Sequence, residues 1–182
     1  MRNHMKIIVR GGRILNPSDK TDIIGDLYIE DGVIKEIGET LKTKETPDKV
    51  INAKGCYVMP GLIDLHVHLR DPGLTYKEDV VTGAKAGAKG GFTTILAMPN
   101  TKPVIDSADR VEYVHNKAKT LAPIHVLQLG AVTKQQKGEE LADIEGMIQA
   151  GIPAISEDGK SVMNVKLYKE AMEIAARHDI PV

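Results

Sequence analysis

The stretch VMPGLIDLHVHLRDPG, residues 58–73, places a row of hydrophilic side chains at the end of an apolar run. In an extended strand, alternate side chains share a face. One face therefore takes Ile63, Leu65, Val67 and Leu69, and the other takes Asp64, His66, His68 and Arg70. This split is typical of a barrel strand, whose outward residues pack on helices while inward residues at its carboxyl end line the active-site mouth.

Strand-like and helix-like stretches alternate after residue 58. We predict strands at 58–69, 93–99, 123–130 and 153–158, separated by helices at 77–90, 107–120, 139–150 and 163–178. The final Ile-Pro-Val resembles the start of a fifth strand. Such units predict an α/β fold with a parallel sheet. We expect residues 59–182 to be about the first half of a (β/α)₈ TIM barrel, truncated because a whole barrel needs about 250 residues.

Residues 1–58 follow a different pattern, with short strand-like runs separated by turn signals. Asp31-Gly32 lies between two alternating apolar runs, which is the strongest short-range signal for a β-hairpin. We therefore predict a small β module ahead of the barrel domain.

The composition indicates a globular protein that carries no strong net charge. Of the 182 residues, 42% are hydrophobic and 27% are charged, and the net charge is -1. This balance gives no general attraction to nucleic acid or to anionic membranes. The single cysteine, Cys56, cannot form an intrachain disulfide, and we expect it to be a small buried hydrophobe. Without an apolar signal-peptide region or a span of about 18 apolar residues, we expect a cytoplasmic protein.

Two imidazoles at positions i and i+2 on one strand face, His66 and His68, are spaced to bind one metal ion together, and Asp64 could orient one of them. Asp158, at the end of the fourth predicted strand, is either a turn residue or a carboxylate that bridges metals in the same mouth. Asn100 follows a proline at the end of the second strand, where an asparagine is common simply because it favours turns. Of the other histidines, His115 and His178 are expected to be solvated on helices, and His125 has no partner at ligand spacing.

The stretches GLIDLHVHLRDPG, YKEDVVTGAKAGAKGGFTTILAMPNTKP and SEDG together resemble the class I dihydroorotases of the amidohydrolase superfamily. The resemblance covers essentially the whole chain and makes residues 1–58 the N-terminal part of a β-sandwich module. It implies a zinc-dependent cyclic amidohydrolase with one or two zinc ions per subunit. Such an enzyme interconverts dihydroorotate and N-carbamoyl-aspartate in pyrimidine biosynthesis.

The resemblance also assigns roles to single residues. His66 and His68 match zinc ligands, Asp158 matches a bridging aspartate, and Arg70 and Asn100 match the pair that holds the substrate carboxylate. The family motif Thr-Asp-Asp-Gly reads Ser-Glu-Asp-Gly here, so Glu157 departs from it. The resemblance implies that the next histidine ligand lies just beyond Val182 and that a further histidine and the aspartate that shuttles the proton come later, which leaves this chain incomplete for catalysis. A homo-oligomer and an aspartate transcarbamoylase partner are also implied.

Two other functions compete with this interpretation. A hydantoinase or allantoinase acts on related rings, but its substrate lacks the carboxylate that would explain Arg70. A non-catalytic homologue that acts as a scaffold for aspartate transcarbamoylase belongs to a different class. Retention of His66, His68 and Asp158 counts against a scaffold.

Overall fold

The computed structural model describes residues 5–182. Residues 1–4, which begin the segment examined for a signal peptide, lie outside the described residues. The chain divides into two compact units, Met1–Pro60 and Gly61–Val182. We call them unit 1 and unit 2; their assignment as a β-sandwich module and a barrel domain stays a prediction.

The described part of unit 1 is one mixed five-stranded sheet. Its strands are β1 (Lys6–Asn16), β2 (Thr21–Glu30), β3 (Val33–Gly38), β4 (Lys49–Asn52) and β5 (Tyr57–Val58). The order is β3-β2-β1-β4, and β5 also pairs with β1. β2 and β3 are antiparallel neighbours joined by Asp31-Gly32, and both of these residues have a positive φ. The predicted hairpin is therefore confirmed.

Cys56 is exposed, so its prediction as a buried hydrophobe is wrong. The reason is a tight turn ahead of β5. The Cys56 amide donates to the Ala53 carbonyl at 2.9 Å, and Gly55 takes a φ of +80°. A side chain at the end of this turn points to solvent before the next strand begins.

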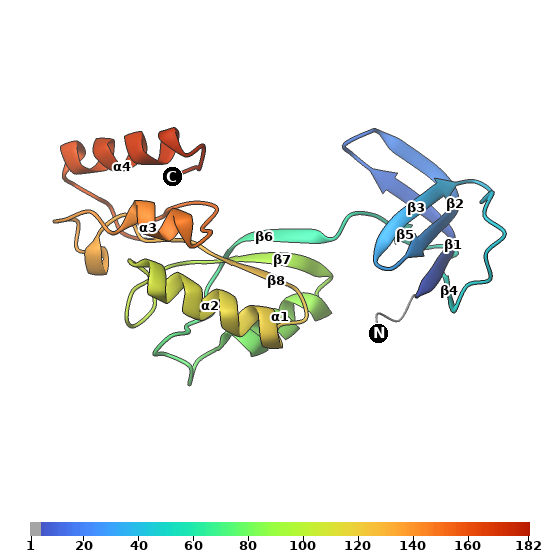
Figure 1. Ribbon diagram of the computed structural model, residues 1–182, viewed down its shortest axis with the longest axis horizontal. Helices are drawn as coiled ribbons and strands as arrows, with labels where there is room; N and C mark the ends of the chain where they lie inside the picture. The colour runs from blue at the N-terminus through green and yellow to red at the C-terminus, as the bar shows by residue number, and fades with distance from the viewer. Residues whose placement is uncertain (1–4) are drawn as a thin grey trace. The chain divides into compact units, whose positions relative to one another are not determined.

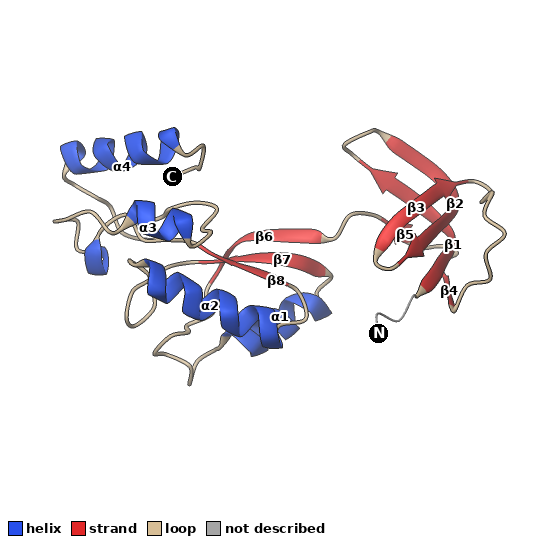
Figure 2. Cartoon of the chain, viewed as in Figure 1, coloured by secondary structure: helices blue, strands red, loops and turns tan. Residues whose placement is uncertain are grey.

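Unit 2 alternates strands and helices (Figures 1 and 2). In chain order they are β6 (Leu62–Val67), α1 (Val80–Lys89), β7 (Phe92–Ala97), α2 (Ala108–Leu121), β8 (His125–Gln128), the 3₁₀ turn η1 (Lys134–Gln136), α3 (Ile144–Gln149) and α4 (Val165–Arg177). The three strands are parallel in the order β6-β7-β8. This arrangement confirms the predicted α/β class.

Helices α1 and α2 pack against β7 and β8 in unit 2. The core between them contains Val80, Ala84, Ile95, Val111 and Val114, each 2% exposed or less. Among residues 5–182, no helix combines the length and the apolar character needed to cross a bilayer. The sheet and its helices form the rigid support from which the strand ends project.

The third predicted helix, 139–150, is shorter than expected. α3 begins only at Ile144, with the Asp143 side chain accepting from the Gly146 amide. The residues before it pair with the loop after β8, because Lys134 donates its amide to the Glu140 carbonyl and Ala142 donates to Val132. Backbone groups used in this pairing are not available for a helix.

The fourth predicted strand, 153–158, is reduced to one parallel bridge between Gly130 and Ile155. Two hydrogen bonds support it, from the Gly130 amide to Ala154 and from the Ser156 amide to Gly130. The chain turns soon afterwards, since Asp158 has a φ of +54°. The Ile155 amide also donates to the Pro181 carbonyl at 3.2 Å, so the Ile-Pro-Val segment lies alongside it without forming a strand.

A bulge interrupts the alternation along β6. Asp64 is paired with Ile95 and Val67 with Ala97, so three residues on β6 match two on β7. Asp64 and Val67, predicted on opposite faces, consequently lie on the same side of the sheet. The predicted apolar face is also divided: Leu69 is buried, whereas Ile63 and Leu65 are 59% and 66% exposed.

Candidate metal centre

Three side chains from distant parts of unit 2 meet at the ends of the parallel strands. Nε2 of His66 lies 3.1 Å from Oδ1 of Asp158, and Nε2 of His68 lies 3.9 Å from the same oxygen. One ligand atom of each residue lies within 4.8 Å of the other two. Two imidazole nitrogens and a carboxylate oxygen that converge in this way can hold a metal ion.

The fold explains this convergence. His66 is the second-last residue of β6, and His68 directly follows the strand. Asp158 comes three residues after Ile155, which forms the bridge to Gly130. Asn100 follows β7 by three residues. The carboxyl ends of parallel strands meet at one edge of a sheet, where α/β proteins place their sites. We call His66, His68, Asn100 and Asp158 the strand-end cluster.

Asn100 connects two members of the strand-end cluster. Its Nδ2 donates to Oδ2 of Asp158 at 2.6 Å, and its Oδ1 lies 2.9 Å from Nδ1 of His68. An ionised carboxylate can only accept, so the amide nitrogen must face Asp158 and the amide oxygen must face His68. Nδ1 of His68 therefore carries the proton, which leaves a lone pair on Nε2 for a metal.

The cluster is open enough for an ion to enter. The side chains of His66, His68 and Asp158 are 56%, 30% and 14% exposed. The carboxylate is thus the best shielded donor, and the imidazoles line the approach to it. Partial burial strengthens the attraction between a carboxylate and a cation.

The other two predicted site residues behave differently. Arg70 lies just past the cluster with a φ of +59°, and within the described part of the chain no hydrogen bond or ion pair joins its guanidinium to the cluster. The Asp64 carboxylate accepts from the His66 backbone amide at 3.1 Å. Asp64 thus stabilises the backbone at the bulge through this bond, and an orienting role toward an imidazole stays a prediction.

Asp71, which sequence reasoning did not single out, is a buried anchor beside Arg70. Its carboxylate accepts from Lys117 Nζ at 2.6 Å, from the Tyr113 hydroxyl at 3.0 Å and from the Val80 amide at 3.3 Å. We call these groups the Asp71 hub. The hydrogen bond to Asp71 raises the pKa of Lys117, while burial, followed by the bond to Asp71, raises the pKa of Tyr113. The partners lie 9 to 46 residues away, so no local pattern reveals them.

Glu157, the departure from the family motif, is also buried, at 7% exposed. Its carboxylate accepts from the Val132 and Thr133 amides and contacts the Thr133 hydroxyl. The sequence drew attention to Glu157 through the motif but gave no sign of these contacts, because Val132 and Thr133 lie 25 and 24 residues away.

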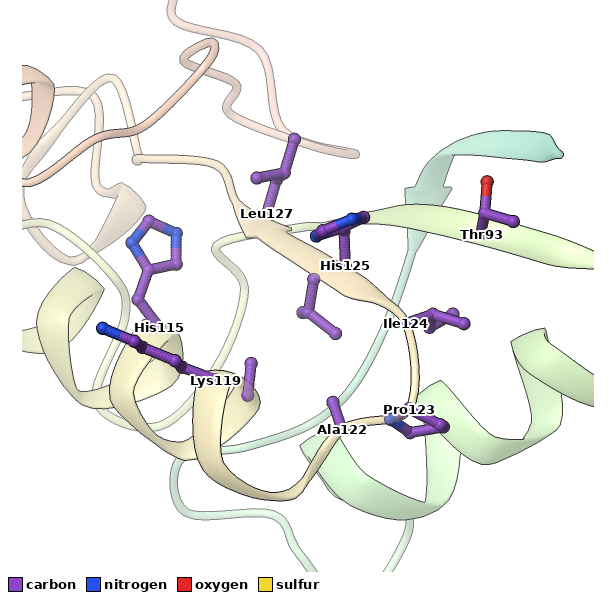
Figure 3. Close-up of a pocket in the computed structure, with 10 residues that line it drawn as sticks. Thr93, His115, Lys119, Ala122, Pro123, Ile124, His125 and Leu127 are labelled. Atoms are coloured by element: carbon purple, nitrogen blue, oxygen red, sulfur yellow. The ribbon is translucent and has the colours of Figure 1, made fainter. Parts of the chain in front are cut away.

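A separate pocket of about 640 Å³ lies between α2 and β8 and is lined by His115, Lys119 and His125 (Figure 3). His115 was predicted to be solvated, but this is wrong: its Nε2 accepts from the Gln128 amide at 3.2 Å. Burial lowers its pKa below the usual 6.5, opposed by a hydrogen bond to the Ala150 backbone. The bond from Gln128 occupies Nε2, so this nitrogen is not free to bind a metal. His178 is exposed, as expected.

The profile of a family described as dihydro-orotase-like matches residues 55–182. The chain is 49% identical over 172 residues to the dihydroorotase of Citrifermentans bemidjiense, an alignment that covers 94% of this chain and 40% of that protein. It is 46% identical over 178 residues to the dihydroorotase of Ruminiclostridium cellulolyticum, covering 98% of this chain and 41% of that protein. The chain thus spans about two fifths of the length of these relatives.

Solved structures give the same fold. An L-hydantoinase (dihydropyrimidinase) from Arthrobacter aurescens matches with a TM-score of 0.79 at 24% identity, covering 96% of this chain and 39% of that one. A D-hydantoinase matches with a TM-score of 0.65 at 33% identity, covering 83% and 32%. These matches confirm the predicted fold class, and the profile and curated relatives confirm the resemblance noted in the sequence. The chain belongs to the dihydro-orotase-like family.

Proposed function

We propose that the protein containing this chain is a zinc-dependent dihydroorotase that interconverts dihydroorotate and N-carbamoyl-aspartate. The observation that carries the proposal is the convergence of His66, His68 and Asp158 in a chain up to 49% identical to dihydroorotases. A role in pyrimidine biosynthesis and a cytoplasmic location are parts of the same proposal and follow from the family resemblance.

The donor set fits zinc. Imidazole nitrogens and carboxylate oxygens are the usual ligands of catalytic zinc, and a carboxylate can also be shared by two ions. His66, His68 and Asp158 would hold the ion, with Asn100 fixing the His68 tautomer and one oxygen of Asp158. Bound zinc supplies a hydroxide near neutral pH and polarises the ring carbonyl of a cyclic amide.

Arg70 and Asn100 are proposed to hold the substrate carboxylate. A guanidinium suits this role because its planar fork can donate two parallel hydrogen bonds to a carboxylate. Asn100 Nδ2 gives one of its two N–H groups to Asp158, which leaves the second free to donate to a substrate carboxylate. The loop bearing Arg70 is tied to the loop bearing Asn100, since Lys102 donates its amide to the Pro72 carbonyl at 3.1 Å.

The comparisons support dihydroorotase over hydantoinase. Curated dihydroorotases are 44–49% identical over nearly the whole chain, while the two hydantoinase structures are 24% and 33% identical. The scaffold function is not favoured, because the metal-binding residue types are kept and lie together.

The decisive test uses the complete protein. We expect bound zinc and turnover of dihydroorotate in preference to hydantoin and allantoin. Arg70→Met should raise KM for dihydroorotate about 10- to 100-fold, because it removes one hydrogen-bonding contact between charged groups. The KM for hydantoin should rise less. Preference for hydantoin or allantoin would refute the substrate, and absence of both zinc and turnover would favour the scaffold. Size-exclusion chromatography with and without an aspartate transcarbamoylase tests the proposed homo-oligomer and partner.

A further inference from the structure

Glu157 directly precedes the candidate ligand Asp158, and its carboxylate is buried and bonded to a distant loop. Its Oε2 accepts from the Val132 amide at 3.0 Å and the Thr133 amide at 3.2 Å, and its Oε1 contacts the Thr133 hydroxyl. Thr133 Oγ1 in turn accepts from the Gly138 amide at 2.9 Å. One buried carboxylate thus holds the loop after β8 at three points.

The Glu157 backbone is held from the same loop and from its own segment. Its carbonyl accepts from Gln136 Nε2 at 3.1 Å and from the Lys160 amide at 3.2 Å. The side chain and the backbone of this residue are therefore both fixed by groups that lie outside the strand-end cluster. Such a residue has little freedom to rotate.

Asp158, the next residue, needs this support. It has a φ of +54°, a conformation that costs a non-glycine residue energy and persists only where its surroundings impose it. Its two oxygens face different partners, Oδ1 toward His66 and Oδ2 toward Asn100. A small rotation of the backbone at residues 157–158 would therefore move Oδ1 away from the imidazoles and Oδ2 away from Asn100.

We propose that Glu157 is a positioning residue for the metal: it fixes the backbone that aims Asp158 at His66 and His68. This inference rests on the proposed function, because it assumes that Asp158 binds zinc. The length of the side chain matters. An aspartate at this position would retract the carboxylate by about 1.5 Å, one carbon–carbon bond, away from the Val132 and Thr133 amides.

The test measures the zinc affinity of the complete protein by competition with a chelator, together with the unfolding temperature of the zinc-free form. Loss of a residue that orients a ligand typically weakens metal binding 10- to 100-fold, and we expect this for Glu157→Ala. Glu157→Asp should also weaken it. Glu157→Gln should restore most of the affinity, because its one amide oxygen can still accept from both backbone amides.

Asp106→Asn is the matched control. Asp106 is equally buried, at 8% exposed, and its carboxylate also accepts from an amide of the same loop, that of Gln135 at 2.8 Å, but it does not adjoin Asp158. We expect this variant to bind zinc like the wild type. If Glu157→Ala does not fold, Glu157→Asp decides, because it keeps a carboxylate at the site.

The outcomes separate the two proposals. A wild-type protein that binds no zinc overturns both. If the wild type binds zinc and turns over dihydroorotate while the folded Glu157 variants bind zinc equally well, the positioning role alone is wrong. It is also wrong if Asp106→Asn weakens zinc binding as much as Glu157→Ala, because loosening the loop would then account for the effect.

Discussion

Two polar regions of unit 2 use the same kinds of side chain and differ in what these side chains contact. In the strand-end cluster, the Asp158 carboxylate faces two imidazoles and an amide. In the Asp71 hub, the carboxylate faces a lysine, a tyrosine hydroxyl and a backbone amide. Asp71 is neutralised by a cation of the protein, whereas the described cluster around Asp158 contains no lysine or arginine.

The imidazoles show the same contrast. His68 gives one nitrogen to Asn100 and keeps Nε2 for the cluster, while His115 has its Nε2 occupied by the Gln128 amide and also bonds the Ala150 backbone. A buried polar group is stable once it is satisfied, so partners within the protein make it structural. The spare donors of the strand-end cluster are what make it a candidate for an external cation.

The largest expected difference between the regions concerns turnover. We expect His66→Ala to lower dihydroorotate turnover by the complete protein at least about 1000-fold, because metal catalysis supplies several kcal/mol of transition-state stabilisation. Its side chain is 56% exposed, so the unfolding temperature of the zinc-free protein should hardly change. Steady-state kinetics and metal analysis measure the effect. His178→Ala, an exposed histidine on the same unit, is the control, and zinc-loaded, active His66→Ala protein would contradict the assignment.

A substitution in the Asp71 hub should have the opposite effect to His66→Ala: a large loss of stability and little change in zinc affinity. Lys117→Met leaves a carboxylate of 0% side-chain exposure without its cation, and we expect a loss of about 3 kcal/mol in the free energy of unfolding. Zinc affinity should stay within about threefold of the wild type, since no hub residue contacts the cluster. Denaturant unfolding provides the measurement. Lys119→Met, an exposed lysine on the same helix, should change stability little, and equal losses in both variants would show that the hub is not an anchor.

We also expect the Asp71 hub to make the stability of the protein depend on alkaline pH. Because the folded-state pKa of Lys117 is raised above its usual 10.5, the stabilisation that it provides is complete below pH 10.5 and is lost as the pH rises through the folded-state value. The wild type should therefore lose stability over this range more steeply than Lys117→Met. Parallel alkaline slopes in unfolding experiments would argue against this coupling.

A smaller effect is expected for Asn100, which belongs to the cluster without being a ligand. Asn100→Ala removes the group that fixes the His68 tautomer, so zinc affinity should fall about 10- to 100-fold. Chelator competition measures this loss, and Asn116→Ala, an exposed asparagine on α2, serves as the control. Unchanged zinc affinity combined with a raised KM for dihydroorotate would mean that Asn100 serves the substrate alone.

Local patterns in the sequence were sufficient to predict the βα order and the pairing of His66 with His68, whereas Asp158 was left either as a turn residue or as a ligand, and only the family resemblance placed it with the histidines. The two histidines lie at the carboxyl end of β6, and the single parallel bridge at Ile155 brings Asp158 to the same edge. The roles of these residues, and of Arg70 and Asn100, remain predictions.

What the sequence did not reveal depends on contacts between distant residues. The bulge at Asp64 arises from the pairing of β6 with β7, and α3 is short because residues before it pair with the loop after β8. The backbone amides bonded by the Glu157 carboxylate lie 24 and 25 residues away, and His115 accepts from the Gln128 amide of β8. Alternation and residue type carry no information about such tertiary partners.

The smallest predicted effect concerns His115, whose Nε2, unlike the Nε2 of His68, is bonded within the protein. Burial lowers its folded-state pKa, so its contribution to stability is present above the unfolded value of 6.5 and is lost as the pH falls through the folded value. His115→Gln keeps one acceptor and one donor without titrating, so its unfolding temperature should fall less than that of the wild type between pH 7 and pH 5. His178→Gln, at an exposed site, should follow the wild type. If His115→Gln instead loses stability with acid as steeply as the wild type, the acid sensitivity comes from other groups, and protonation of His115 contributes little to it.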